Sequence, residues 1–357
     1  MRPRQVAEHS SRDSVEVRAS SKPARSGGSP PAGLRVRRPG SPTAGWRIFG
    51  ARLGHGASPP FEVIGAYAEL SKLGIVLLVL VSAGAGFMLR APLGPEFPWA
   101  HGLLVLLGVM LLSCGASALN QVQERERDAL MARTVGRPLP SGRLSHAQGL
   151  MFSLVGIVSG ALVLALGIGM AAGILGLIAA AFYNGIYTPW LKPTSPFAAV
   201  PGAIPGSIPP VIGWVAGGGG LTDSGAVILF GILFLWQMPH FWALALRFRT
   251  DYQAGGFPIV SESVGVEGTA RLILLYAFGL TAWSLAAPTF GVGGPAGLLA
   301  AAGLGGRLIW LASKFARRPE DQRGWLSLFV FSNVYLLLLF IVMVAERVAR
   351  HVLLSHS

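Results

Sequence analysis

The strongest constraint on the fold is a series of long apolar stretches that recurs from about residue 70 to near the end of the chain. Each is close to the roughly 20 residues that a helix needs to cross the apolar core of a bilayer. The predicted spans are residues 73–90, 99–120, 148–167, 169–188, 196–216, 225–246, 270–289, 295–312 and 325–346. Because backbone inside a bilayer must satisfy its own hydrogen bonds, we expect an all-α, polytopic membrane protein with about nine transmembrane helices.

The composition agrees with this interpretation and excludes other classes of protein. Hydrophobic residues make up 52% of the 357 residues and charged residues 13%, which is unlike an ordinary soluble domain. The single cysteine, Cys114, excludes an intrachain disulfide and a cysteine-rich metal site. Although the net charge is +13, aromatic residues do not alternate with basic ones as in a nucleic-acid surface, so no nucleic-acid partner is expected.

The excess positive charge lies mostly at the start of the chain. Residues 1–60 contain 11 Lys/Arg against 3 acids and are rich in Pro, Gly and Ser, which predicts a disordered basic tail. A mitochondrial transit peptide has a similar composition and stays an alternative. The predicted organisation is therefore a tail at 1–60, a nine-helix domain at 61–350, and a short C-terminal tail at 351–357.

The distribution of basic residues predicts the orientation of the chain. With nine spans, fourteen Lys/Arg fall in or beside the loops on the side of the N-terminal tail, against three on the other side. Since cytoplasmic loops of membrane proteins carry the excess of Lys and Arg, the N-terminus is predicted to be cytoplasmic. We expect a bacterial plasma membrane, with a mitochondrial inner membrane and a matrix-facing N-terminus as the alternative.

Three polar segments follow the second, fourth and sixth spans, all on the predicted cytoplasmic side. Asn120, Glu124 and Asp128 have the spacing i, i+4, i+8, so on a continuing helix they share one face over about 12 Å. Carboxylates bind hard cations, and Mg²⁺ is commonly held by one or two of them together with substrate phosphates. Asp251, after the sixth span, is a further candidate ligand, and Asp128 is expected to be an exposed residue at the rim of the site.

Cationic side chains accompany these acids and predict an anionic substrate. The candidates to neutralise phosphate oxygens are Arg133, Arg137, Lys192 and Arg249. If the anion is a diphosphate on an allylic carbon, metal and cations would stabilise it as a leaving group, and an apolar chamber would keep water from the carbocation. The proline-rich fifth span is expected to be kinked and is a candidate to line that chamber.

The segment "NQVQERERDALMARTVGRPLPSG", residues 120–142, resembles the N-x-x-x-D-x-x-x-D…R-T-x-x-R-P-L-x-x-G signature of the UbiA superfamily of intramembrane prenyltransferases. The resemblance extends from about residue 65 to 347. It implies a nine-helix bundle around a central cavity, Mg²⁺ as cofactor and an isoprenyl diphosphate as substrate. It also implies catalytic roles for Asn120, Glu124 and Asp128, although Glu124 stands where the superfamily often has Asp.

A second segment, "WQMPHFWALALRFRTDYQAGGFPIV" at residues 236–260, is similar to the protohaem IX farnesyltransferase branch of that superfamily. This implies transfer of farnesyl from farnesyl diphosphate to a vinyl group of haem B, with addition of water. The product, haem O, would pass to a haem A synthase or a terminal oxidase assembly. Where quinone-type relatives carry D-x-x-x-D, Asp251 is followed four residues later by Gly255, which favours a haem-type acceptor.

Four further residues are candidates for the site. Asp251 would be a catalytic metal ligand. Tyr187, which the resemblance supports, and Tyr252 would contact the diphosphate, or else anchor helices at the interface. His240 would contact the acceptor, since neutral imidazole can bind haem iron, or else be a packed, hydrogen-bonded residue of its helix. Other interpretations stay open: a quinone precursor or chlorin acceptor, a small-molecule transporter, or a haem chaperone. Every Asp and Glu after residue 60 lies near a helix end or in a loop, which disfavours a transporter with an acid at mid-bilayer.

Overall fold

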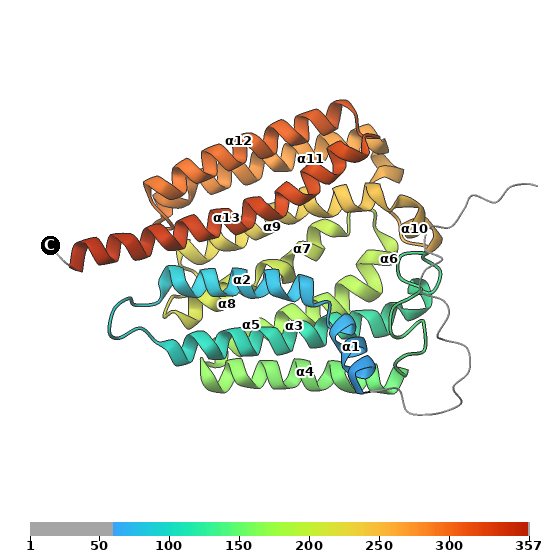
Figure 1. The fold of residues 1–357 in the computed structure, drawn as a ribbon, viewed down its shortest axis with the longest axis horizontal. Coiled ribbons are helices and arrows are strands. Elements are labelled where there is room, and N and C mark those ends of the chain that lie inside the picture. The colour runs from blue at the N-terminus through green and yellow to red at the C-terminus, as the bar shows by residue number, and fades with distance from the viewer. Residues whose placement is uncertain (1–59, 356–357) are drawn as a thin grey trace, which may run out of the picture. The chain divides into compact units, whose positions relative to one another are not determined.

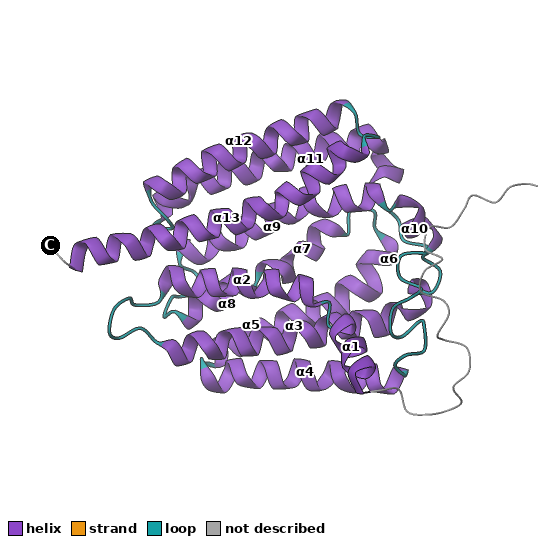
Figure 2. Cartoon of the chain, viewed as in Figure 1, coloured by secondary structure: helices purple, strands orange, loops and turns teal. Residues whose placement is uncertain are grey.

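The computed structural model describes residues 60–355, which form helices joined by loops, without a strand in that range (Figures 1 and 2). The helices before the middle of the chain are α1 (Pro60–Leu70), α2 (Leu73–Arg90), α3 (Trp99–Asp128), α4 (His146–Gly167), α5 (Met170–Ala181), η1 (Phe182–Leu191) and α6 (Lys192–Thr194). Those that follow are α7 (Ala199–Ser207), α8 (Pro209–Ala216), α9 (Ser224–Arg247), α10 (Arg249–Ala254), α11 (Val260–Ala286), η2 (Ala287–Phe290), α12 (Pro295–Arg317) and α13 (Gln322–Ser355).

Within residues 60–355, nine helical segments are long and apolar enough to cross a membrane, as the sequence predicts. The protein is therefore a multi-pass, all-α membrane protein. The two boundaries that differ most from the prediction are the start of α11, at Val260 rather than near 270, and the end of α13, at Ser355 rather than near 346. The predicted C-terminal tail at 351–357 is thus helical over most of its length, because Leu353 and Leu354 are good helix formers and neither Gly nor Pro interrupts this stretch. The predicted N-terminal tail lies outside the described residues.

The fourth span changes from an α-helix to a π-helix where it reaches the charged end of the bundle. The π-helix η1 covers Phe182–Leu191 and contains Pro189. Proline has no N–H, so the carbonyl of Asn184, five residues earlier, has no π-helical partner. It accepts a hydrogen bond from Gln123 of α3 at 2.7 Å instead. This contact ties η1 to α3, and π-helical turns are frequent at functional sites.

The fifth span is interrupted, as its prolines predict. α7 ends at Ser207 and α8 begins at Pro209, and both helices contribute to the wall of an internal cavity. Gln237 of α9 contacts the chain near this break, since its amide donates to the Ala203 carbonyl at 3.0 Å and to the Ser207 hydroxyl oxygen at 3.2 Å.

Glycines allow α3 and α4 to approach at backbone distance. A Cβ atom on Gly115 would lie 2.6 Å from the backbone nitrogen of Ile157, and one on Gly156 would lie 3.0 Å from the Gly115 Cα. Small residues at such interfaces let membrane helices pack closely. The close pairing holds α3 firmly, and the charged C-terminal end of α3 extends beyond it.

Candidate active site

The described helices enclose a cavity of about 590 Å³ that is charged in one part and aromatic in another. Its wall draws on α2, α3, η1, α7, α8, α9 and α13, and on the segment that joins α10 to α11. Nine of the residues predicted from the sequence line it: Asn120, Glu124, Asp128, Arg133, Arg137, Tyr187, Lys192, His240 and Tyr252. Arg249 and Asp251 do not line it. The cavity therefore unites most of the predicted site from segments more than 100 residues apart.

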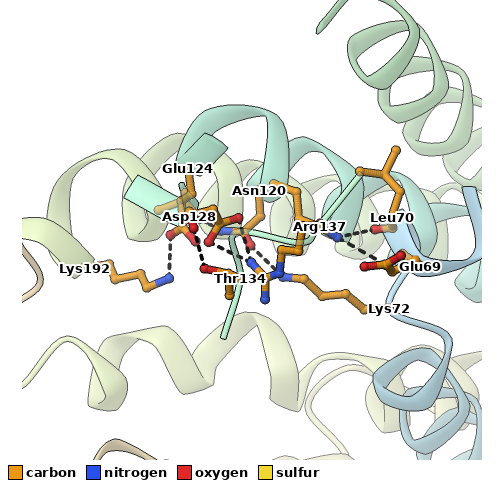
Figure 3. Close-up of polar contacts among 11 residues, drawn as sticks. Glu69, Leu70, Lys72, Asn120, Glu124, Asp128, Thr134, Arg137 and Lys192 are labelled. Atoms are coloured by element: carbon orange, nitrogen blue, oxygen red, sulfur yellow. Dashed lines mark hydrogen bonds and ion pairs between the residues drawn. The ribbon is translucent and has the colours of Figure 1, made fainter. Parts of the chain in front are cut away.

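The three residues of the first motif lie on one face of α3, because that helix continues unbroken to Asp128. Their side chains point toward the same charged cluster (Figure 3). Asn120, Glu124 and Asp128 are all buried, and the exposed fraction of Asp128 is 0%. The prediction of an exposed Asp128 was wrong. The loop after α3 folds back over the end of the helix, and Thr134 Oγ1 donates to the Asp128 carbonyl at 2.8 Å.

Each buried carboxylate is paired with a cation from another segment (Figure 3). Arg137 Nη1 lies 2.9 Å from Asp128 Oδ1 and 2.7 Å from Oδ2. Lys192, at the start of α6, places Nζ 2.5 Å from Glu124 Oε1. Buried charges are tolerated only when they are paired in this way. The two ion pairs bring the loop after α3 and the end of η1 against the same face of α3. The sequence suggests this arrangement but does not show it.

Lys72 is a member of the site that sequence reasoning missed. It precedes α2, adopts the left-handed conformation with φ 53°, and donates from Nζ to Asn120 Oδ1 at 2.7 Å. Burial and the nearby Arg137 guanidinium lower the pKa of Lys72 to about 7, while Glu124 opposes this shift. The available signal in the sequence is a lysine directly before the first predicted span, where it counts among the fourteen basic residues that predict the orientation. Non-glycine residues held at positive φ concentrate at functional sites.

The charge of the lining residues suits an anionic ligand. Three cations, Arg133, Arg137 and Lys192, and the Lys72 amine, which is charged below its pKa of about 7, face the cavity together with two carboxylates, Glu124 and Asp128, among the described residues. The excess of cations is greater than the paired acids can neutralise. A diphosphate would balance it, since Arg and Lys bind phosphate oxygens through charge-assisted hydrogen bonds.

The carboxylates also fit a metal that is shared with such an anion. In residues 60–355, no three His, Cys, Asp or Glu side chains come together as a self-sufficient metal site. Glu124 and Asp128, one helical turn apart and both facing the cavity, nevertheless match the usual mode of Mg²⁺, which takes one or two carboxylates and completes its shell with phosphates and water. The donor set therefore fits Mg²⁺ bound with a diphosphate rather than Mg²⁺ bound alone.

The second motif is divided between the cavity and the surface. Tyr252 and Phe257 line the cavity, and the Phe257 ring lies under two cations, with Lys192 Nζ 4.5 Å and Arg127 Cζ 4.8 Å from its centroid. Asp251 is partly exposed and has no side-chain partner in the described part of the chain. Arg249 pairs with Glu320 at 3.6 Å on the surface. Their predicted roles in metal and diphosphate binding stay predictions.

The aromatic part of the wall is formed by α9 and α13. His240 lies between two rings, with centroid distances of 4.9 Å to Trp236 and 4.5 Å to Phe329, and both pairs are stacked. His240, Trp236, Phe329 and Asn333 all line the cavity. Trp242 also lines it, and its indole N–H is one of three buried polar atoms without a partner in the described residues. This wall offers flat apolar surface together with the unpartnered indole N–H of Trp242.

This fold and this cavity have counterparts among known proteins. Residues 77–335 match the UbiA prenyltransferase family, and the chain belongs to that family. It is 37% identical over 281 residues to protoheme IX farnesyltransferase of Bdellovibrio bacteriovorus. This alignment covers 79% of this chain and 96% of that protein.

Solved structures show the same fold at lower sequence identity. A structure of digeranylgeranylglyceryl phosphate synthase superimposes with a TM-score of 0.65 and 19% identity, covering 79% of this chain and 99% of the other. A UbiA homolog from Archaeoglobus fulgidus bound to DMAPP and Mg²⁺ gives a TM-score of 0.54 with 14% identity, covering 78% of this chain and 99% of that one.

Proposed function

We propose that this chain is a Mg²⁺-dependent prenyltransferase that transfers farnesyl from farnesyl diphosphate to a vinyl group of haem B. The observation that carries the proposal is a single cavity with a cationic, carboxylate-bearing part and an aromatic part that contains His240. The similar protein from Bdellovibrio bacteriovorus is named for this activity, and the similarity covers 96% of that protein and 79% of this chain. The products would be haem O and diphosphate.

The charged part of the cavity would hold the diphosphate. Arg137, Lys192, Lys72 and Arg133 would contact its oxygens, and Glu124 and Asp128 would hold Mg²⁺ against it. Bound Mg²⁺ would supply charge neutralisation of the leaving group. Arg137 and Lys192 are paired with Asp128 and Glu124 in the described structure, so these cations are already in place when the anion arrives. Preorganised charges of this kind stabilise developing negative charge without reorganisation.

The apolar part of the cavity would hold the farnesyl chain and exclude water. Among its lining residues are Ile75, Leu78, Val79, Leu112 and Leu164. The C–O bond to diphosphate breaks with carbocation character at farnesyl C1, and the vinyl terminal carbon forms the new C–C bond. Water then adds to the inner vinyl carbon and loses a proton, which leaves the hydroxyethylfarnesyl chain. A dry chamber prevents water from capturing the first cation before the vinyl group does.

The aromatic wall would bind the porphyrin acceptor. Trp236 and Phe329 present flat rings, and His240 would contact the haem, with its imidazole as a ligand for the iron. The unused indole N–H of Trp242 would donate to a polar group of the acceptor, since a buried donor without a partner is costly. Tyr187 and Tyr252 line the cavity and would contact the diphosphate.

We further propose a bacterial plasma membrane as the location, with the N-terminus and the charged end of the cavity on the cytoplasmic side. The distribution of Lys and Arg supports this orientation. A haem A synthase or a terminal oxidase assembly would receive the product.

One incubation tests the proposed reaction. Purified protein in lipid would be supplied with haem B, farnesyl diphosphate and Mg²⁺, with and without a chelator, and the porphyrins would be identified by mass. We expect a Mg²⁺-dependent hydroxyethylfarnesyl adduct that the chelator abolishes. Folded protein that forms no adduct with haem B, yet prenylates a quinone precursor or a chlorin, would overturn the acceptor assignment.

A further inference from the structure

The imidazole of His240 is held by a hydrogen-bond chain that runs into α13. His240 Nδ1 lies 3.1 Å from Ser332 Oγ, and Ser332 Oγ donates to the Phe329 carbonyl at 2.7 Å. A serine hydroxyl has a single proton. When Ser332 donates that proton to the Phe329 carbonyl, its oxygen can only accept a hydrogen bond from the imidazole. With the proton of Ser332 on this carbonyl, Nδ1 is the protonated nitrogen of a neutral His240.

Asn333 does not change this assignment. Its Nδ2 donates to the same Phe329 carbonyl at 2.9 Å and lies 3.4 Å from His240 Nδ1. The longer distance is outside the usual range for hydrogen bonds from N–H donors, so the contact with Ser332 decides the tautomer.

The ring cannot turn easily to exchange its two nitrogens. His240 is stacked between Trp236 and Phe329. Trp236 Nε1 in turn donates to the Ser332 carbonyl at 2.5 Å, which ties that ring to α13, the helix beside α9 in Figure 1. With Nδ1 directed at α13, Nε2 lies on the other edge of the ring. Nε2 has no protein partner within residues 60–355, and His240 lines the cavity.

We propose that Ser332 is a positioning residue that holds His240 in the Nδ1–H tautomer, so that the Nε2 lone pair binds the iron of a metalloporphyrin in the cavity. The inference deepens the proposed function and depends on it for the identity of the ligand. Metal-binding histidines usually donate their second ring N–H to a protein acceptor, and that contact orients the ring. Here the acceptor is a serine hydroxyl and the orienting stack is aromatic.

The tautomer can be tested without any ligand. In protein with ¹⁵N-labelled histidine, the two ring nitrogens of His240, assigned by comparison with His240→Ala, should show protonated Nδ1 and unprotonated Nε2. Ser332→Ala should lose this preference and give a mixture of tautomers. Ser153→Ala is the matched control, because Ser153 is also fully buried and donates to a carbonyl four residues earlier, at 2.7 Å, but lies on α4 away from the cavity. Protonated Nε2 in the unaltered protein would overturn the inference.

Binding of the metalloporphyrin tests the second part. Haem B titrated into the full chain should show the absorption and magnetic resonance signature of iron with an axial nitrogen ligand, and His240→Ala should remove it. We expect Ser332→Ala to weaken haem B binding by about 10-fold, the usual lower bound for the group behind a metal ligand, with a reduced nitrogen-ligated fraction. Iron-free protoporphyrin IX should bind Ser332→Ala and the unaltered protein equally.

The outcomes separate this inference from the proposed function. If haem B is farnesylated but Ser332→Ala and Ser153→Ala bind it alike and with the same spectrum, the role of Ser332 is refuted while the function stands. If His240 has the expected tautomer but the chain binds no haem B and does not farnesylate it, the acceptor assignment fails and the iron-binding half of the inference fails with it.

Discussion

The two polar motifs of this chain are of a similar kind in the sequence, although the second has a single aspartate, and they differ further in the structure. The first, on α3 and the loop after it, contributes Asn120, Glu124 and Asp128, all of them buried and facing the cavity. The second, around α10, contributes Tyr252 to the cavity, whereas Asp251 has no side-chain partner in the described residues and does not line it. Both motifs follow an apolar span and both place acids beside cations.

The difference lies in what covers each motif. The loop after α3 folds back and places Arg137 against Asp128, and η1 brings Lys192 against Glu124. Around α10, the ion pair found among the described residues is that of Arg249 with the exposed Glu320. A buried ion pair in a cavity is strongly coupled to a bound anion, whereas a surface pair is screened by water. Charged residues of the same types should therefore contribute more to anion binding at the first motif than at the second.

The largest expected contrast is between the two aspartates. Asp128→Asn should lower the rate of prenyl transfer by more than about 100-fold. The substitution removes a proposed metal ligand itself, and loss of a residue that merely orients a metal ligand already costs about 10- to 100-fold. Asp251→Asn should lower the rate by about 10-fold or less. Turnover at saturating Mg²⁺ would be measured for both variants, together with thermal unfolding to verify the fold. An equal loss in Asp251→Asn would show that substrate draws α10 into the cavity.

Arg137 and Arg249 allow the two motifs to be compared by substrate binding rather than by turnover. Arg137→Ala removes a cavity cation that would contact the diphosphate, so the KM for farnesyl diphosphate should rise about 10- to 100-fold, consistent with about 1.5–3 kcal/mol for one hydrogen bond to a charged group. Arg249→Ala should change KM less than about 2-fold, because its partner Glu320 is exposed. If the two variants lose affinity equally, the surface arginine also reaches the diphosphate.

Lys72 makes anion binding at the first motif dependent on pH. Its pKa is about 7 against an ordinary 10.5, so between these values the folded protein holds the neutral amine while the unfolded chain keeps the proton. The contribution of Lys72 to the free energy of unfolding therefore rises with pH across this window. A bound diphosphate favours the charged amine of Lys72. The affinity of the protein for diphosphate should therefore fall above pH 7, by at most about tenfold per pH unit, because a single proton is involved.

The charge-retaining variant provides the control for that pH dependence. Lys72→Arg stays protonated throughout, and calorimetry with inorganic diphosphate between pH 6.5 and 9 should give a flatter profile than the unaltered protein. Identical profiles in both proteins would assign the pH dependence to the ligand or to another group.

The smallest effect is expected just outside the first motif. Arg143, in the same loop as Arg137, pairs with Glu69 at 2.6 Å, but both side chains are 44% exposed. Arg143→Ala should lower the free energy of unfolding by less than about 1 kcal/mol, as is usual for exposed pairs, and leave kcat/KM unchanged. Thermal unfolding and steady-state kinetics would measure both. A large loss of activity would mean that the cationic site extends along the whole loop.

The sequence alone was sufficient for the membrane-spanning helices and for the face of α3 that carries the site. Length and hydrophobicity specify a span locally, and the i, i+4, i+8 spacing specifies a shared face on any continuing helix. The prolines around residue 208 likewise predicted the break between α7 and α8, because a missing N–H acts within its own turn. These are effects of near neighbours in the chain.

Only the tertiary structure decided which polar residues belong together and how deeply they lie. Lys72 joins Asn120 across 48 residues, Lys192 joins Glu124 across 68, and Ser332 orients His240 across 92. The burial of Asp128 and the exclusion of Asp251 from the cavity depend in the same way on whether a distant loop or helix covers each side chain. Such contacts, and the dielectric environment that they create, follow from how helices pack, and no local pattern in the sequence encodes them.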